Sequence, residues 1–270
     1  MSHHSVEPLD STTISHFLTP QARQQITRID IHDTLDSTIT QAWQLSKQTD
    51  LHNQVFVVMT EQQTAGRGRR GRPWQSPAGH NIYLSLHWPF QCPAQQLQGL
   101  SITTAISLWQ ALHTAGFADI AAKWPNDLLH HQKKLAGVMI ELNSNTQAVI
   151  SIGLNVHLPA EMLAEIDQPT TWLTQISATP IQRNALVATL LNQLCDNFSQ
   201  LQQHGFAAFL PIWAQINANQ DKSVTIITDH GNIHGIDRGI DHQGNLQLEI
   251  DQGIQTFAAG EVSLRASHHS

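Results

Sequence analysis

The sequence feature that most constrains the fold is the stretch from Thr64 to Trp74, which reads TAGRGRRGRPW. It contains no hydrophobic residue between Ala65 and Pro73, so it has nothing of its own to bury. Glycine lets the backbone approach a ligand closely, and arginine offers planar, permanently charged forks that match carboxylate and phosphate oxygens. We therefore expect residues 64–74, called here the arginine loop, to be mobile when empty and ordered over an anion. A solvated basic loop or a nucleic-acid-binding segment fits these residues equally well.

The arginine loop is flanked by two strand patterns. Residues 55–60 (VFVVMT) predict a buried strand that runs into the loop, and residues 81–88 (NIYLSLHW) alternate as the next strand does. A loop that joins two strands of a sheet is a binding-loop candidate on a rigid scaffold. Trp74, at the far end of the loop, is either an anchor for the loop or a wall of the ligand site.

The charge distribution favours one anionic ligand over a general affinity for nucleic acid. The chain of 270 residues has a formal net charge of −7, which disfavours a nucleic-acid binder. Half of its 14 Lys and Arg residues nevertheless fall within two short stretches, 67–72 and 123–134. No histidine pair has metal-ligand spacing, so we expect no protein-built metal cage. No apolar run approaches the ~20 residues of a membrane span, and the two cysteines are far apart, so we expect a cytoplasmic protein without membrane contact.

Three further segments carry polar residues at the ends of predicted elements. Ser37 and Thr38 precede a helix through about residue 47, and either can cap it or face a ligand. Pro125 stops the strand 120–124 and places Asn126 and Asp127 at its mouth. The strands predicted at 135–142 and 148–156 contain Gly137 and Gly153, which indicate either a closely approaching ligand or a bulge.

The remaining pattern divides the chain into an N-terminal extension (1–24), a larger domain (25–218) and a C-terminal unit (219–270). Long helices are predicted at 95–115 and 184–204, and a turn at 130–133. After residue 219, short strands at turn spacing predict a small antiparallel barrel.

Five motifs in this order resemble the biotin protein ligase family, also called biotin–[acetyl-CoA-carboxylase] ligases. They are GRGRRGRPW at 66–74, KWPNDL at 123–128, KKLAGVMIE at 133–141, GLNV at 153–156 and GEVSLR at 260–265. The resemblance covers about residues 26–265. It implies an α+β fold: a mixed, largely antiparallel sheet of the class II synthetase-like biotin/lipoate ligase type, with helices packed on one side and a C-terminal SH3-like β-barrel. Residues 1–25 are too few for the winged-helix domain of some members, so we expect the monofunctional type, which binds no DNA.

The resemblance also implies the reaction. Members use ATP to activate biotin as biotinoyl-5′-AMP, and then transfer biotin to a lysine of the biotin carboxyl carrier domain of acetyl-CoA carboxylase. Mg²⁺ is expected to accompany ATP, and a weak or ligand-dependent homodimer is compatible with the family. Three other readings remain open: a lipoate–protein ligase, a nucleic-acid-binding module that uses the arginine loop, and an inactive scaffold of the same fold.

Carried onto this sequence, the family pattern assigns roles to individual residues. Lys134 is the central cation between the biotin carboxylate and the α-phosphate, Arg67 assists it, and Asp127 orients or deprotonates the acceptor lysine unless it only caps a turn. The residues implied for biotin are Ser37, Thr38, Gln63, Arg67, Gly68, Arg69, Lys134, Gly137 and Gly153. The residues implied for ATP and the adenylate are Arg69, Arg70, Arg72, Trp74, Asn126, Lys134, Asn155, Trp172 and Arg265. Ile39 stands where the family usually has Asn, which puts Ile39 in doubt as a ligand contact.

Overall fold

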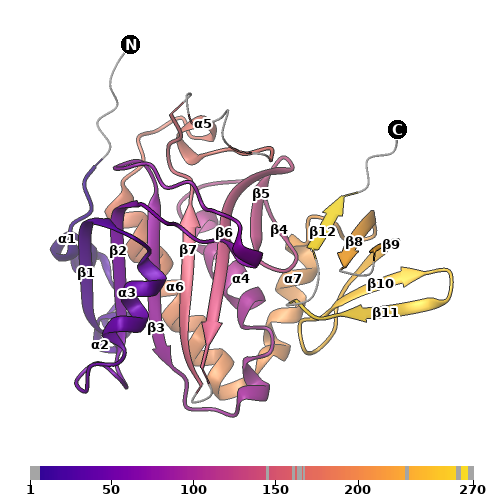
Figure 1. Cartoon of the computed structure of the whole chain (residues 1–270), viewed down its shortest axis with the longest axis horizontal. Coiled ribbons are helices and arrows are strands. Elements are labelled where there is room, and N and C mark those ends of the chain that lie inside the picture. The colour runs from indigo at the N-terminus through magenta and orange to yellow at the C-terminus, as the bar shows by residue number, and fades with distance from the viewer. Residues whose placement is uncertain are drawn as a thin grey trace.

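A seven-stranded mixed sheet organises the larger part of the molecule (Figure 1). The computed structural model describes residues 7–143, 146–159, 162, 166, 168–228, 231–259 and 263–266. The strands are β1 (Ile26–Leu35), β2 (Val55–Gln63), β3 (Ile82–Pro89), β4 (Ile120–Lys123), β5 (Asp127–His130), β6 (Lys133–Leu142) and β7 (Gln147–Leu154). Their order is β1-β2-β3-β7-β6-β5-β4, and only the β1–β2 pairing is parallel. The predicted mixed, largely antiparallel sheet is therefore confirmed.

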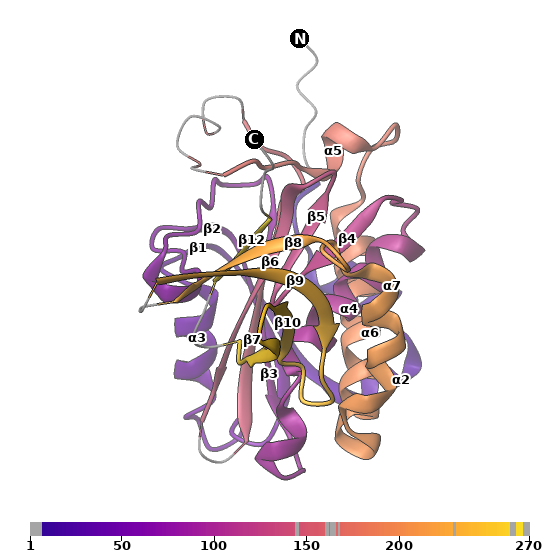
Figure 2. The same ribbon diagram turned by 90° about the vertical axis from the view of Figure 1, so that its right-hand side faces the viewer.

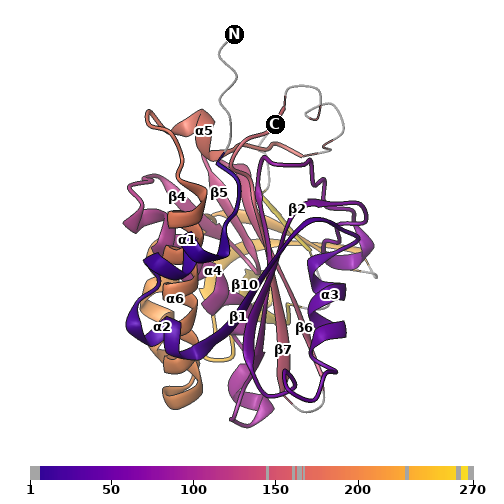
Figure 3. The ribbon, with the colours of Figure 1, turned by 90° about the vertical axis from the view of Figure 1, so that its left-hand side faces the viewer.

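Most helices cover one face of this sheet, and one helix covers the other. Figures 2 and 3 show α1 (Ser11–Phe17), α2 (Pro20–Gln25), α4 (Leu100–Thr114), α6 (Arg183–His204) and α7 (Leu210–Ile216) on one side, and α3 (Thr38–Leu45) on the opposite side. The alternation along β2 explains both layers, because Val57 and Met59 join the large core under α4 and α6, while Phe56 and Val58 join a smaller cluster under α3. The predicted packing of helices on one side of the sheet is confirmed for the long helices. The structure adds α3, which covers the opposite face.

One predicted helix begins later in the structure than its sequence pattern indicates. The helix expected from residue 95 is interrupted: residues Ala94–Leu97 form a 3₁₀ turn, and α4 begins at Leu100. Gly99 breaks it with a φ of 62°, and the Phe206 ring lies 2.3 Å from where a Cβ at this position would stand. The turn expected at 130–133 is confirmed, because His130 pairs with Lys133 and the two residues between them, His131 and Gln132, both have positive φ as in a tight hairpin.

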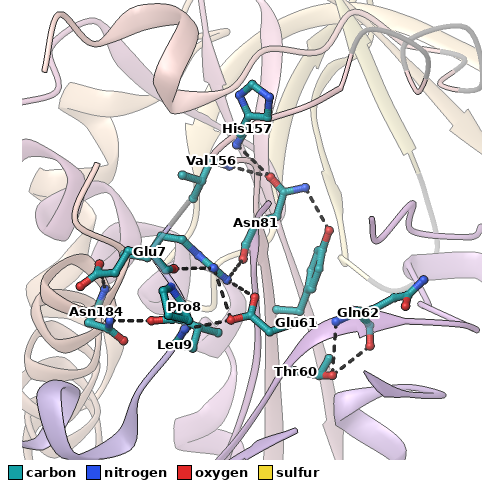
Figure 4. Close-up of polar contacts among 12 residues, drawn as sticks. Glu7, Pro8, Leu9, Thr60, Glu61, Gln62, Asn81, Val156, His157 and Asn184 are labelled. Carbon is teal, nitrogen blue, oxygen red and sulfur yellow. Dashed lines mark hydrogen bonds and ion pairs between the residues drawn. The ribbon is translucent and has the colours of Figure 1, made fainter. Parts of the chain in front are cut away.

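The N-terminal residues are tied to the sheet by a buried polar network (Figure 4). The Arg183 guanidinium, at the start of α6, is fully buried and donates to the Glu61 carboxylate at 2.6 Å. It also donates to the carbonyls of Glu7 and Asn81, while the Leu9 amide donates to the other oxygen of Glu61. Since Glu61 lies on β2, this network fixes the strand that feeds the arginine loop.

The C-terminal residues form a separate five-stranded antiparallel sheet, consistent with the expected SH3-like unit. Its strands are β8 (Ser223–Thr228), β9 (Gly231–Ile240), β10 (Leu246–Ile250), β11 (Gly253–Phe257) and β12 (Ser263–Ala266), in the order β11-β10-β9-β8-β12. The junction is hydrogen-bonded, because the Ala218 amide donates to the Ala122 carbonyl and the Trp124 indole donates to the Gly244 carbonyl. Among the described residues, no helix is long and apolar enough to cross a membrane.

Candidate active site

A cavity of about 130 Å³ opens where the arginine loop crosses the sheet between α3 and the hairpin β5–β6. The N-terminus of α3, the end of β2, the arginine loop and strands β6 and β7 all contribute to its wall. The lining residues are Ser37, Thr38, Ile39, Gln63, Arg67, Gly68, Arg69, Arg72, Pro73, Trp74, Asn126, Asp127, Lys134, Gly137, Val138, Met139, Ser151, Ile152, Gly153 and Gln168. The two basic stretches of the sequence therefore meet at one site.

A lysine–carboxylate pair forms the charged centre of the cavity. The Lys134 ammonium lies 2.9 Å from Oδ1 of Asp127, and the two side chains are only 16% and 17% exposed. The hairpin geometry produces this pair, because Asp127 begins β5 and Lys134 lies near the start of β6, on either side of a register shift. Partial burial strengthens such a pair relative to one in water. An incoming anion would compete with Asp127 for the ammonium group.

Trp74 lies against the sheet over two glycines. A Cβ on Gly153 would stand 2.4 Å from the Trp74 indole, and a Cβ on Gly137 would stand 3.0 Å from it. The Gly137–Gly153 pairing lies in regular register, so the alternative of a bulge at these glycines is wrong. The Lys134 ammonium lies 5.1 Å from the centre of the indole, within range of a cation–π contact. The glycines thus make room for the indole that closes one side of the cavity.

The backbone of the arginine loop closes on itself. The Trp74 amide donates to the Gly66 carbonyl, and the Gly68 amide donates to the Arg72 carbonyl. A Cβ on Gly66 would lie 2.5 Å from the Trp74 carbonyl oxygen, so glycine is required there. Arg70 has a φ of 57°, which turns the tip of the loop in a short 3₁₀ segment.

Two arginines of the loop are held by partners on different elements. Arg67 lies 3.6 Å from the carboxylate of Glu141 on β6 and donates to the Thr40 hydroxyl on α3. Arg69 donates to the Asn126 side chain at 2.9 Å and to the carbonyl of Ala259, which follows β11. Burial lowers the pKa of the Arg69 guanidinium, and the nearby Asp127 carboxylate opposes that shift.

A chain of amide and hydroxyl groups joins the N-terminus of α3 to the end of the arginine loop. Both the amide and the hydroxyl of Thr38 donate to the Gln63 side-chain carbonyl, at 3.0 and 3.3 Å. The Gln63 amide group donates to the Ser76 hydroxyl, which donates to the Trp74 carbonyl. Ser37 occupies the N-cap of α3 without making a side-chain capping bond, so simple capping does not account for its hydroxyl. This part of the site is neutral and rich in hydrogen-bonding groups.

The structure brings most of the predicted site residues together. All nine residues implied for biotin line the cavity, as do Arg69, Arg72, Trp74, Asn126 and Lys134 from the nucleotide set. Arg70, Asn155 and Trp172 are not among the lining residues. Asn155 is buried and donates to the Thr171 carbonyl, so in this structure it holds the segment beside Lys134. The Arg265 side chain is outside the described residues.

Seven lining residues were missed by the sequence interpretation or left in doubt. They are Ile39, Pro73, Val138, Met139, Ser151, Ile152 and Gln168. Strand alternation was an available signal for two of them, because Ser151 stands two residues before Gly153 and Met139 two residues after Gly137. Gln168 had no such signal. It is placed by backbone hydrogen bonds that its neighbours Pro169 and Thr171 make with Lys134.

Comparisons with known proteins agree on one family. The family model described as "Biotin/lipoate A/B protein ligase family" matches residues 32–157, and the "Biotin protein ligase C terminal domain" model matches residues 221–265. A biotin–[acetyl-CoA-carboxylase] ligase of Paracoccus denitrificans is 33% identical over 76% of this chain and 88% of its own length. The bifunctional ligase/repressor BirA of Escherichia coli is 37% identical over 77% of this chain, which spans 66% of that relative. The solved biotin protein ligase of Aquifex aeolicus, in complex with biotin and ATP, shares the fold with a TM-score of 0.75 at 24% identity, covering 90% of this chain and 100% of that one.

Proposed function

This chain belongs to the biotin protein ligase family, and we propose that it activates biotin with ATP and transfers it to a lysine of a biotin carboxyl carrier domain. The observation that carries the proposal is the half-buried Lys134–Asp127 pair, which lines one cavity together with the cationic arginine loop and the neutral side chains of Thr38 and Gln63. Activation requires two anions, a carboxylate and a triphosphate, to approach one another. A cavity lined both by cations and by neutral hydroxyl and amide groups suits that pair of substrates.

In the first step, a biotin carboxylate oxygen attacks the α-phosphorus of ATP. The new O–P bond gives biotinoyl-5′-AMP, and the broken P–O bond releases pyrophosphate. Lys134 turns from Asp127 toward the attacking carboxylate and the α-phosphate, and so stabilises the charge that builds up between them. Three residues of the arginine loop, Arg67, Arg69 and Arg72, neutralise part of the remaining negative charge on the phosphates. Closure of this loop excludes water from the mixed anhydride.

In the second step, the ε-amine of the carrier lysine attacks the acyl carbon. The amide forms, AMP leaves, and the proton of the amine must be taken up. Asp127 fits that role, because its carboxylate loses its ion pair when Lys134 engages the phosphate. Its position in the cavity wall, 2.9 Å from the Lys134 ammonium, also suits it to orient the incoming ammonium ion.

The proposal extends to the metal, to the nucleotide contacts and to the assembly of the protein. Mg²⁺ prefers a few carboxylates together with substrate phosphates. In the described part of the chain, no group of three His, Cys, Asp or Glu residues could hold a metal, so we propose that Mg²⁺ enters with ATP. Arg70, Asn155, Trp172 and Arg265 remain our candidates for contacts with the nucleotide, to be reached when the cavity fills. The absence of DNA binding and the ligand-dependent homodimer remain predictions.

The nearest rival substrate is lipoate, which has a carboxylate tail but no urea. The hydroxyl and amide groups around Thr38 and Gln63 suit a urea better than a dithiolane ring, which would bring an apolar group without hydrogen-bonding atoms against them. Exchange of radiolabelled pyrophosphate into ATP tests the first step directly. We expect exchange that depends on biotin and not on lipoate, whereas exchange with lipoate alone would overturn the substrate assignment.

A further inference from the structure

The floor of the cavity contains a serine that the proposed mechanism does not use. Ser151 lies on β7, two residues before Gly153 on the same face, and its half-buried side chain lines the cavity. Its hydroxyl oxygen is 2.7 Å from the hydroxyl of Ser85, the residue directly opposite on β3. Ser85 is fully buried and in turn lies 2.8 Å from the Thr38 hydroxyl. These contacts extend the polar chain around Gln63 into the sheet.

The donor and the acceptor of each hydrogen bond in this chain can be assigned by starting at Gln63. The Thr38 backbone amide can only donate, so the Gln63 atom that accepts it at 3.0 Å must be the carbonyl oxygen. The Gln63 amide nitrogen therefore faces Ser76, whose single proton is donated to the Trp74 carbonyl. On the other side, the Thr38 hydroxyl gives its proton to the same Gln63 oxygen.

The donor and acceptor roles of the Ser85 and Ser151 hydroxyls follow from this assignment. Because the Thr38 proton is committed to Gln63, Ser85 must donate to Thr38. Because each hydroxyl carries one proton, Ser151 must then donate to Ser85. The Ser151 oxygen is left with lone pairs and no proton to offer to the cavity. It can bind a ligand hydrogen-bond donor, and it disfavours a ligand acceptor at that position.

We propose that Ser151 is a specificity-determining residue that accepts a hydrogen bond from a ureido N–H of biotin, with its polarity set by Ser85. This inference rests on the proposed function and deepens it, because it requires the ligand to present a hydrogen-bond donor to the Ser151 hydroxyl oxygen. A ligand with an oxygen atom in place of that N–H would face the Ser151 lone pairs. Accepting it would require Ser151 to turn its proton away from Ser85, which would leave the buried Ser85 oxygen without its donor.

The test is calorimetric binding of biotin and its two cyclic carbamate analogues, in each of which one ureido N–H is replaced by a ring oxygen. We expect the wild-type protein to bind one carbamate at least 10-fold more weakly than biotin, since a site built for a donor rejects an isostere that lacks it. The Ser151→Ala variant should bind biotin roughly 3- to 10-fold more weakly, as for one lost hydrogen bond, and should lose most of the discrimination against that carbamate.

The Ser85→Ala variant separates polarity from shape. It keeps the Ser151 hydroxyl but frees its proton, so discrimination against the carbamate should also fall. Ser107→Ala is the matched control, because Ser107 is a buried serine of α4 outside the cavity and should leave the discrimination unchanged.

Three outcomes would overturn the inference while leaving the proposed function intact. They are equal binding of biotin and both carbamates by the wild type, unchanged discrimination in Ser151→Ala, and unchanged discrimination in Ser85→Ala. Failure of the folded wild-type protein to bind biotin at all would instead overturn the proposed function itself.

Discussion

At the scale of single residues, the half-buried Lys134 and the fully buried Arg183 have contrasting surroundings. Lys134 is paired with a carboxylate that a substrate anion can replace, and it faces the cavity. Arg183 is paired with Glu61 of β2 and also donates to two backbone carbonyls. The first arrangement suits catalysis, and the second suits stability.

Replacing Lys134 with alanine should reduce the rate of biotin-dependent pyrophosphate exchange by about 10²- to 10³-fold, because the removed ammonium stabilises charge that develops in the transition state. Lys133→Ala is the control, since Lys133 is exposed and does not line the cavity. Steady-state exchange kinetics on both variants provide the comparison. Equal losses in the two variants would contradict the role assigned to Lys134.

Replacing Glu61 with alanine should destabilise the protein by about 3 kcal/mol, because it leaves the buried Arg183 guanidinium without its counter-charge. Urea unfolding monitored by fluorescence measures the change. A Glu61→Leu/Arg183→Leu double variant removes both charges and should recover part of the loss. A double variant as unstable as the sum of its single changes would show that the pair is not coupled.

At the scale of elements, the arginine loop and the paired glycine strands form one unit. Gly137 and Gly153 are opposite one another in β6 and β7, and the Trp74 indole packs over both. The loop is therefore attached to the sheet at Trp74, while its arginines reach Glu141, Asn126 and Ala259. Any change that displaces the indole should also loosen the loop.

Substituting alanine for Gly153 should open the loop, because the new methyl group would lie 2.4 Å from the indole. Gly137→Ala is the graded control, since the same contact there is 3.0 Å. Limited trypsin digestion reports loop exposure, because the cleavage sites lie within residues 67–72. We expect trypsin to cleave Gly153→Ala fastest, Gly137→Ala more slowly and the wild type most slowly. Identical cleavage rates would refute the anchoring of the loop by Trp74.

The site could be predicted from the sequence only where local pattern carried the information. The arginine loop, the Lys134 strand entry and the Asn126–Asp127 turn are contiguous motifs between recognisable strands, and the structure places them together. Gln168 and the Arg183–Glu61 pair depend on contacts between segments far apart in the chain, which no local period encodes. Ser151 was within reach of the strand alternation, but its polarity depends on Ser85, Thr38 and Gln63, which lie on other elements.

At the scale of the whole molecule, the C-terminal sheet is joined to the larger sheet by a buried polar junction. Asp237 of β9 is fully buried and accepts hydrogen bonds from the Asn217 side chain and the Gly239 amide. Burial raises the pKa of the Asp237 carboxyl, the nearby Asp221 carboxylate adds to that rise, and the two hydrogen bonds oppose it. The charged form of Asp237 is therefore a cost of the folded junction.

This shift predicts a pH dependence of stability with a definite sign. Because the pKa is higher in the folded protein than in the unfolded chain, the Asp237 contribution is fully present below the unfolded value and is lost as pH rises through the folded value. As pH rises from about 4 to about 7, the free energy of unfolding of the wild type should therefore fall relative to that of Asp237→Asn, whose side chain does not titrate. Urea unfolding of both proteins across that range measures it. A constant difference would show that the carboxyl does not titrate abnormally.

The central claim is that one Lys134-centred site makes the adenylate and delivers biotin to a carrier lysine. Intact-mass measurement of a biotin carboxyl carrier domain, incubated with this protein, Mg-ATP and biotin, tests it most directly. Lipoate replaces biotin in a parallel reaction, and Lys134→Ala replaces the wild type in a third. We predict a mass gain equal to one biotinoyl group that is absent with lipoate and absent, on the same time scale, with the variant. A gain with lipoate alone, or no gain with either acid from a folded protein, would contradict the account.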